Sequence, residues 1–378
     1  MENQPFCAWP WFHQHVLAEG GMSPCCLWSK RVPGYDHDSF FKGEFMQGLR
    51  QQFNEQKPGP ECSKCTYNES VGLYSQRLKS FEYARKFQID FNQAPQLLSQ
   101  EVNISNVCNI RCRSCNETRS TKWITEAIAL GRKPQGLLKS GWSLSAYHAQ
   151  HTKRLQFLGG EPLMHQDEII AALRTIERYG NLPDVSLMLN SNLTLKFCDE
   201  LVELMSKMRR IHIGCSIDGV EGLNDYIRSD SKWSEIVENL SQIKQMEQSF
   251  RGMRFWISTV YSVLNAHGFE KLLNLAIDLD TKVSVIFCKS PIILDARNLP
   301  YDYKMRLIQK YQSLLESYQL PTHQALLQSV IAHLGNAPTM ETAEWIEKFT
   351  YQNDILDQRR DMHLRDMVPE LDAVVRIS

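Results

Sequence analysis

The stretch VNISNVCNIRCRSC, residues 102–115, gathers three cysteines directly after an alternating apolar run. The alternation over Val102–Val107 predicts a half-buried β-strand. The loop that follows this strand carries Cys108, Cys112 and Cys115. Three thiols within eight residues are untypical of an apolar core, so this loop is a candidate metal site.

The spacing Cys-x3-Cys-x2-Cys discriminates between kinds of metal site. Three thiolates on one loop can hold three corners of a [4Fe–4S] cube and leave the fourth iron open. A structural zinc site needs four ligands, and no fourth cysteine or histidine follows at a zinc-type spacing. An open iron can chelate the amino and carboxylate groups of S-adenosylmethionine (SAM), whose reductive cleavage releases a 5′-deoxyadenosyl radical.

Composition limits the functional class of this 378-residue chain. The formal net charge is −1, which gives no clear footprint for nucleic acid. No apolar run approaches the roughly 18–20 residues that span a bilayer, and no secretory signal opens the sequence. Eleven cysteines, an odd number, disfavour a disulfide framework and favour ligation or catalysis. We therefore expect a cytoplasmic protein without a membrane or nucleic-acid partner.

Alternating strand-like and helix-like stretches predict an α/β fold for the central region. Six short apolar or alternating runs are interpreted as strands: 101–107, 153–158, 184–189, 210–217, 254–262 and 281–288. Helix-like stretches lie between most of them, at 166–179, 195–208, 232–247 and 266–279. This order predicts βαβ units, and six units fit a partial (β/α)6 barrel of the TIM type. Ligands of such folds gather at the carboxyl ends of the strands.

The same patterns divide the chain into three regions. Residues 1–98 look irregular and cysteine-rich, residues 99–290 form the partial barrel, and residues 291–378 read as mostly helical. Helices of this last region are expected near 302–318, 321–334 and 341–361. The charged run Asp357–Asp361 is interpreted as a solvated, salt-bridged helix face.

Polar residues end three more of the predicted strands. In Gly159-Gly160-Glu161-Pro162 the glycines allow close backbone approach and the carboxylate can attract an ammonium group, although Glu161 could instead cap a helix. The run 190–192 could form an Asx turn instead of contacting a ligand, and Arg228 could be a solvated arginine at a helix end. The candidate cofactor-binding residues are Gly159, Gly160, Glu161, Asn190, Asn192, Ser216, Asp218 and Arg228.

The cysteine triplet followed by Gly159–Pro162 resembles the radical SAM superfamily over about residues 99–290. The resemblance implies that Cys108, Cys112 and Cys115 hold the SAM-binding [4Fe–4S] cluster, and that the polar strand ends hold SAM. Ser114 departs from the family, which often has an aromatic residue there beside the adenine. The phrase Ser216–Val220 with Tyr226–Arg228 is similar to radical SAM enzymes that act on peptides.

The amino-terminal cysteines resemble a second cluster site. The spacing Cys7-x13-Gly21-x4-Cys26 is similar to the first half of a SPASM or twitch domain, and Cys62-x2-Cys65 extends the match. Known members carry this module after the barrel, whereas here it precedes the barrel. A four-cysteine zinc knuckle is the other interpretation. The resemblance implies an auxiliary [4Fe–4S] cluster held by Cys7, Cys26, Cys62 and Cys65, with Cys25 as the alternative to Cys26.

These features predict a radical SAM enzyme that abstracts hydrogen from a peptide or protein side chain. A small metabolite, such as an amino acid or sugar, is the alternative substrate. A second alternative is a non-catalytic iron–sulfur electron carrier or scaffold. The expected electron donor is an external reductant such as flavodoxin or ferredoxin. The groups that act after hydrogen abstraction are unknown, and the scattered Cys198, Cys215 and Cys288 are candidates, although core or strand positions are the simpler interpretation.

Overall fold

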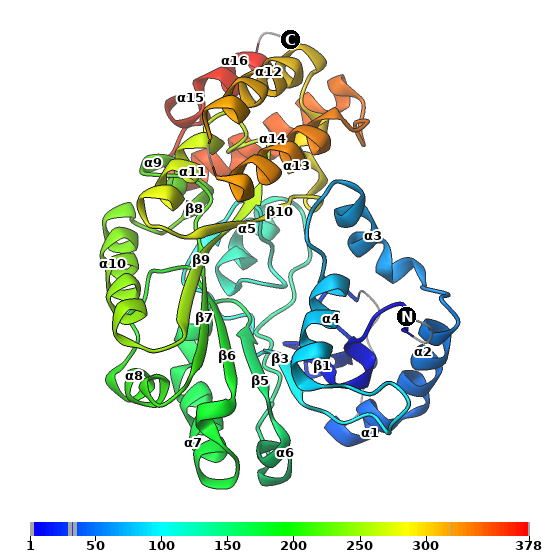
Figure 1. Ribbon diagram of the computed structural model, residues 1–378. Helices are drawn as coiled ribbons and strands as arrows, with labels where there is room; N and C mark the ends of the chain where they lie inside the picture. Colours follow the sequence, from blue (N-terminus) through cyan, green and yellow to red (C-terminus); the bar gives the residue numbers. More distant parts are fainter. Residues whose placement is uncertain (1–3, 29–31, 33–35, 319, 377–378) are drawn as a thin grey trace.

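A curved, mostly parallel sheet organises the protein, whose computed structural model describes residues 4–28, 32, 36–318 and 320–376 (Figure 1). The ends of the predicted first and last regions, residues 1–3 and 377–378, lie outside these ranges. The strand order is β10-β9-β7-β6-β5-β3-β1-β2. Six of these strands follow the predicted barrel order: β3 (Ser99–Asn103), β5 (Arg154–Leu158), β6 (Ser186–Ser191), β7 (Arg210–Ser216), β9 (Met253–Tyr261) and β10 (Lys282–Phe287).

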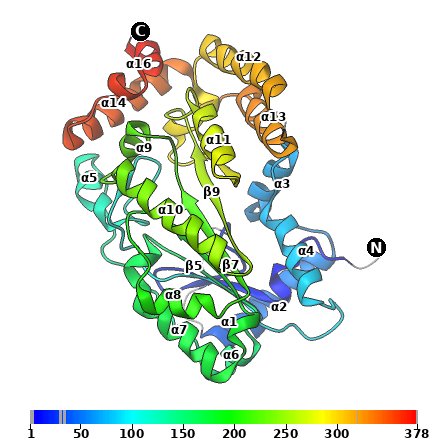
Figure 2. The same cartoon turned by 60° about the vertical axis from the view of Figure 1, so that its left-hand side comes forward.

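The helices between these strands cover the outer face of the sheet. Figure 2 shows α10 lying along this face, with α7 and α8 beside it. Alternate strand residues such as Phe157, Leu189 and Ile213 point into this layer and are fully buried. Their period of two, set against the 3.6-residue period of the helices, produces the predicted βαβ layering. The covering helices are α7 (Gln166–Tyr179), α8 (Asp199–Ser206), α10 (Trp233–Ser249) and α11 (Phe269–Asp278). The predicted partial α/β barrel is confirmed.

Helices also form the last part of the chain, as predicted. They gather at one end of the molecule, above β10 (Figure 1). No helix among the described residues is long and apolar enough to cross a bilayer. The five helices are α12 (Tyr301–Ser317), α13 (Pro321–Gly335), α14 (Thr342–Arg360), α15 (Leu364–Met367) and α16 (Pro369–Arg376).

The amino-terminal region is more regular than its sequence suggested. Its short strand β1 (His13–Val16) pairs in parallel with β3, so that it extends the sheet by one strand before the antiparallel β2 (Met22–Ser23). An aromatic cluster that includes Trp9, Trp11 and Phe12 fills the interior of this region. Three helices contribute residues to this cluster: α1 (His37–Lys42), α2 (Glu44–Asn54) and α4 (Gln76–Phe87). The fourth helix of the region, α3 (Ser63–Ser70), packs through Tyr67 against the main core.

A close backbone contact joins the end of β5 to the segment that leads into the cysteine loop. The amides of Gly160 and Glu161 donate hydrogen bonds to the carbonyls of Ser105 (2.9 Å) and Val107 (2.8 Å). A Cβ atom on Gly160 would lie 2.0 Å from the carbonyl oxygen of Val107. Glycine is therefore required at this position, because any side chain would separate the two backbones.

We expect Gly160→Ala to lower the free energy of unfolding by about 2–3 kcal/mol, since the added methyl group overpacks a backbone contact. Denaturant unfolding of the metal-free protein measures this loss. Gly48→Ala is the matched control, because no atom lies within 4 Å of its added Cβ. Equal unfolding midpoints for the two variants would contradict the interpretation.

Candidate functional site

The cysteine loop is held by a two-residue strand, β4 (Arg111–Cys112), that pairs with β8 (Arg228–Ser229). Cys112 lies opposite Arg228 in this antiparallel ladder. The Arg113 amide donates to the carbonyl of Ile227 at 2.7 Å, and the Cys115 amide donates to that of Cys112 at 3.0 Å. The backbone of the loop is thus fixed by hydrogen bonds on both sides of Cys112.

The three thiols of this loop lie near one another and near one cation. Burial raises the pKa of Cys108 and Cys112, and raises the pKa of Cys115 to about 11. The guanidinium of Arg228 lowers the pKa of all three thiols, but burial has the larger effect. The thiols therefore stay protonated in the metal-free protein, and positively charged metal ions would stabilise the thiolates.

Glu161 connects the ends of two strands. One carboxylate oxygen, Oε1, accepts the Leu163 amide at 3.1 Å and caps the short 3-10 helix that follows, while Oε2 accepts the Asn192 amide at 2.7 Å. Despite these hydrogen bonds, burial raises the pKa of Glu161 to about 7. A cationic group bound beside it would favour the ionised form. Glu161 thus caps the helix that follows it, and its carboxylate can still bind a cation.

Asn192 and Asn190 lie at the end of β6. The side-chain amide of Asn192 lies 3.9 Å from the sulfur of Cys108 and donates to the Asn109 side chain at 2.9 Å. Its oxygen accepts the Thr194 amide at 3.0 Å, so the Asx turn considered as the alternative is present. Asn190 is half-buried and covers Gly214 of β7, where a Cβ would lie 2.4 Å from the Asn190 side-chain nitrogen.

Asp218 and Arg228 form a buried ion pair beside the thiols. Asp218 Oδ2 lies 2.9 Å from Arg228 Nη1, and Asp218 Oδ1 accepts the Val260 amide at 2.7 Å. Arg228 is buried rather than solvated, which excludes the alternative of a free helix-end arginine. Ser216 ends β7 and lies opposite Ser258 of β9. The Asp218 carbonyl also accepts the Asn265 side chain, an anchor that the sequence motifs did not indicate.

The scattered cysteines occupy three different environments. Cys198 is exposed at the start of α8, so a core position for it is wrong. Cys215 is fully buried in the main core. Cys288 is buried just after β10, with its sulfur 3.7 Å from the carbonyl oxygen of Ser290. Of the three, Cys288 lies at a carboxyl strand end.

The amino-terminal region brings four cysteines around one small cavity. Burial raises the pKa of the Cys7 thiol to about 11 and that of Cys62 to about 12. Cys26 does not line this cavity, and it lies against the carboxylate of Glu101. The four cysteines that line it are Cys7, Cys25, Cys62 and Cys65.

The thiols of each described cysteine group lie too far from one another to bind a single metal ion together. Among the described residues, no three Cys, His, Asp or Glu side chains are close enough to hold one ion. A tetrahedral zinc site holds each sulfur at about 2.3 Å from the metal, which needs closely gathered thiols.

Comparison with known proteins identifies the central region. The sequence model of the Radical SAM superfamily matches residues 102–275. The structure described as native anSMEcpe with bound AdoMet and Kp18Cys peptide aligns at 17% identity and a TM-score of 0.42, covering 58% of this chain and 62% of its own. Streptococcus suis SuiB bound to S-adenosylmethionine aligns at 15% identity and a TM-score of 0.41, and the alignment covers 77% of this chain and 65% of SuiB. The chain spans about three fifths of the anSMEcpe length, and no curated protein matches it.

We expect Asp218→Asn to lower the free energy of unfolding by about 3–5 kcal/mol, because Arg228 would be left as an unpaired buried charge. Chemical denaturation of the metal-free protein measures this effect. Glu177→Gln is the control, since it breaks only solvent-exposed ion pairs, with Arg174 and Lys207, and should change the free energy of unfolding far less. Adding Arg228→Met to Asp218→Asn should recover part of the loss, and further destabilisation would argue against an unpaired charge.

Proposed function

We propose that the protein reductively cleaves SAM and abstracts hydrogen from a peptide or protein side chain, because residues 102–275 of this chain form a radical SAM enzyme domain. The family implies a [4Fe–4S] cluster and SAM, and we assign the cluster to Cys108, Cys112 and Cys115. When bound, the cluster would supply the electron that breaks the sulfonium C–S bond. The observation that carries the proposal is the convergence of these three thiols with Glu161 and Arg228 at neighbouring strand ends.

The donor groups fit this pair of cofactors. Three cysteines on one loop leave one cluster corner for SAM, as the chemistry requires. Glu161 is a buried carboxyl group that a cation would help to ionise, and the SAM ammonium is such a cation. Arg228 lies beside the thiols and is held in place by Asp218, so it suits the SAM carboxylate. Fixed groups of this kind orient SAM before the reaction.

An unclosed sheet supports a peptide or protein substrate. β10 is an edge strand, and its Ile286 is 56% exposed. Through the register with Val260, Ile286 shares the concave face with Ser258 and Ser216. An exposed edge next to the reaction site can pair with an extended peptide backbone. The similarity of Ser216–Val220 to peptide-acting enzymes agrees with this assignment.

We further propose that Cys7, Cys25, Cys62 and Cys65 bind an auxiliary [4Fe–4S] cluster. The shared cavity supports Cys25 as the fourth ligand in place of Cys26. Adjacent residues point in different directions, so one of the two faces the cavity while the other faces Glu101. Four thiolates fully ligate one cube, which suits electron transfer or a structural role.

Reduction of the anaerobically reconstituted protein with dithionite should yield 5′-deoxyadenosine from SAM, and Cys112→Ser should reduce this yield to background. Dithionite here replaces the external reductant, for which we propose a flavodoxin or ferredoxin.

Adding a deuterated peptide fraction should transfer deuterium into 5′-deoxyadenosine, as mass spectrometry would detect. Transfer from a deuterated small-metabolite fraction alone would replace the peptide assignment. Clusters without 5′-deoxyadenosine would instead identify an electron carrier.

We expect Cys25→Ser to remove about four irons per chain while Cys26→Ser retains them, because only Cys25 lines the cavity among this adjacent pair. Iron and sulfide analysis, with Mössbauer spectra of the 57Fe-reconstituted variants, makes the comparison. The two substitutions are chemically identical and adjacent, so each controls for the other. Iron loss confined to Cys26→Ser would show that Cys26, not Cys25, is the fourth ligand. One zinc ion per chain in place of iron would show that the site is a zinc knuckle.

A further inference from the structure

Arg113, the residue after Cys112, is 1% exposed, and each of its three guanidinium nitrogens has a hydrogen-bond partner. Its Nη2 lies 2.6 Å from Asp357 Oδ1, its Nη1 donates to Asn353 at 2.9 Å, and its Nε donates to the Tyr226 carbonyl at 3.0 Å. Its Cζ also lies 3.7 Å from the centroid of the Tyr226 ring. Helix α14 therefore contacts the cysteine loop directly, on the carboxyl side of Cys112.

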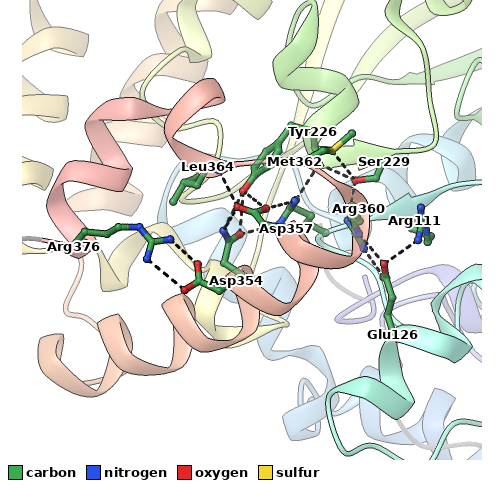
Figure 3. Close-up of polar contacts among 12 residues, drawn as sticks. Arg111, Glu126, Tyr226, Ser229, Asp354, Asp357, Arg360, Met362, Leu364 and Arg376 are labelled. Carbon is green, nitrogen blue, oxygen red and sulfur yellow. Dashed lines mark hydrogen bonds and ion pairs between the residues drawn. The ribbon is translucent and has the colours of Figure 1, made fainter.

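Arg111, the residue before Cys112, reaches the same helix through one intermediate. Its Nη1 lies 3.2 Å from Glu126, and Glu126 pairs through both oxygens with Arg360 of α14 (2.8 and 2.5 Å). Arg360 also donates to Ser229 of β8 at 2.9 Å. Figure 3 shows this chain of contacts converging on the last turns of α14.

These contacts correct one sequence prediction. The run Asp357–Asp361 was expected to be a solvated helix face, but Asp357 and Arg360 are both buried. The expectation holds for Gln358, Arg359 and Asp361, which are exposed. It was wrong for Asp357 and Arg360 because their partners, Arg113 and Glu126, lie 244 and 234 residues away in the sequence. No local charge pattern can reveal a partner at such a separation.

We propose that Asp357 is a positioning residue for the cysteine loop, and that the end of α14 acts as a brace on both sides of Cys112. This inference rests on the proposed cluster at Cys108, Cys112 and Cys115, because it concerns how that loop is held. The brace has two physical effects. It fixes the backbone of the loop through Arg113, and its carboxylate neutralises a buried positive charge next to a cluster ligand.

The electrostatic effect has a definite sign. Reduction adds a negative charge to an iron–sulfur cluster, so an uncompensated cation nearby stabilises the reduced form. Replacing Asp357 by asparagine leaves the Arg113 cation without its carboxylate while keeping the shape of the side chain. The reduction potential of the neighbouring cluster should therefore rise. A helix that merely packed against the barrel would not shift this potential.

Asp354 provides a matched control on the same helix. It is 46% exposed and lies 2.6 Å from Arg376 of α16, as Figure 3 shows. Asp354→Asn removes the same charge from α14, three residues away, and breaks an ion pair remote from the cysteine loop. Any effect of Asp357→Asn that Asp354→Asn lacks can thus be assigned to the brace.

The first experiment uses the metal-free full-length chain and hydrogen exchange. We expect Asp357→Asn to speed exchange at least tenfold at the amides of Arg113 and Cys115, which are hydrogen-bonded in the loop. Exchange in the central strands should not change, and Asp354→Asn should match the wild type throughout. Tyr226→Phe, which removes the 2.9 Å hydrogen bond to Asp357, gives a milder variant in case the first does not fold.

The second experiment measures the midpoint potential of the SAM-binding cluster by EPR-monitored redox titration. A shift to higher potential in Asp357→Asn, absent in Asp354→Asn, supports the brace. Unchanged loop exchange together with an unchanged potential would overturn it. A wild-type chain without a redox-active cluster at the triplet would instead refute the proposed function, whereas the exchange experiment on metal-free protein still tests the brace.

Discussion

The two-residue pairing of β4 with β8 is the interaction on which the candidate site depends. It places Cys112 opposite Arg228 and so brings the cysteine loop to the segment that carries the buried cation. Arg228 is held in turn by Asp218, whose carboxylate accepts the amide of Val260 near the end of β9. A short ladder therefore transmits the geometry of a rigid parallel sheet to a loop that has little secondary structure of its own.

Buried charge is the recurring cost of this arrangement. Arg113, Arg228 and Glu126 are all removed from water, and each is matched by an opposite charge on another segment. Such pairs add little net stability, because desolvation offsets their attraction. They restrict the segments to one relative placement, since any displacement would leave a charge unpaired. Glu161 differs from these three, because it accepts backbone amides and burial raises its pKa, as is common for carboxylates at ligand-binding sites.

The sequence predicted those features that rest on local patterns. The period of two in β5 and β7 and the helical period of α7 located the barrel to within a few residues, and the cysteine triplet stood out by spacing. Other features depend on tertiary contacts. The choice between Cys25 and Cys26 depends on side-chain direction, which composition does not encode. β1 was missed because its sequence, HQHV, is mostly polar and does not alternate, and because its buried histidines depend on the distant Ser99 and Asn103 for hydrogen bonds as well as on nearby residues.

The long separation between Arg113 and its partners on α14 has a consequence for biosynthesis. The cysteine loop leaves the ribosome about 240 residues before Asn353, which at roughly 5–20 residues per second is a delay of about 10–50 s. During this interval Arg113 lacks its carboxylate partner, whereas Glu126 and Asp230, the partners of Arg111, are synthesised earlier. The positive charge of Arg113 would therefore stay without its counter-charge in the nascent chain until α14 docks.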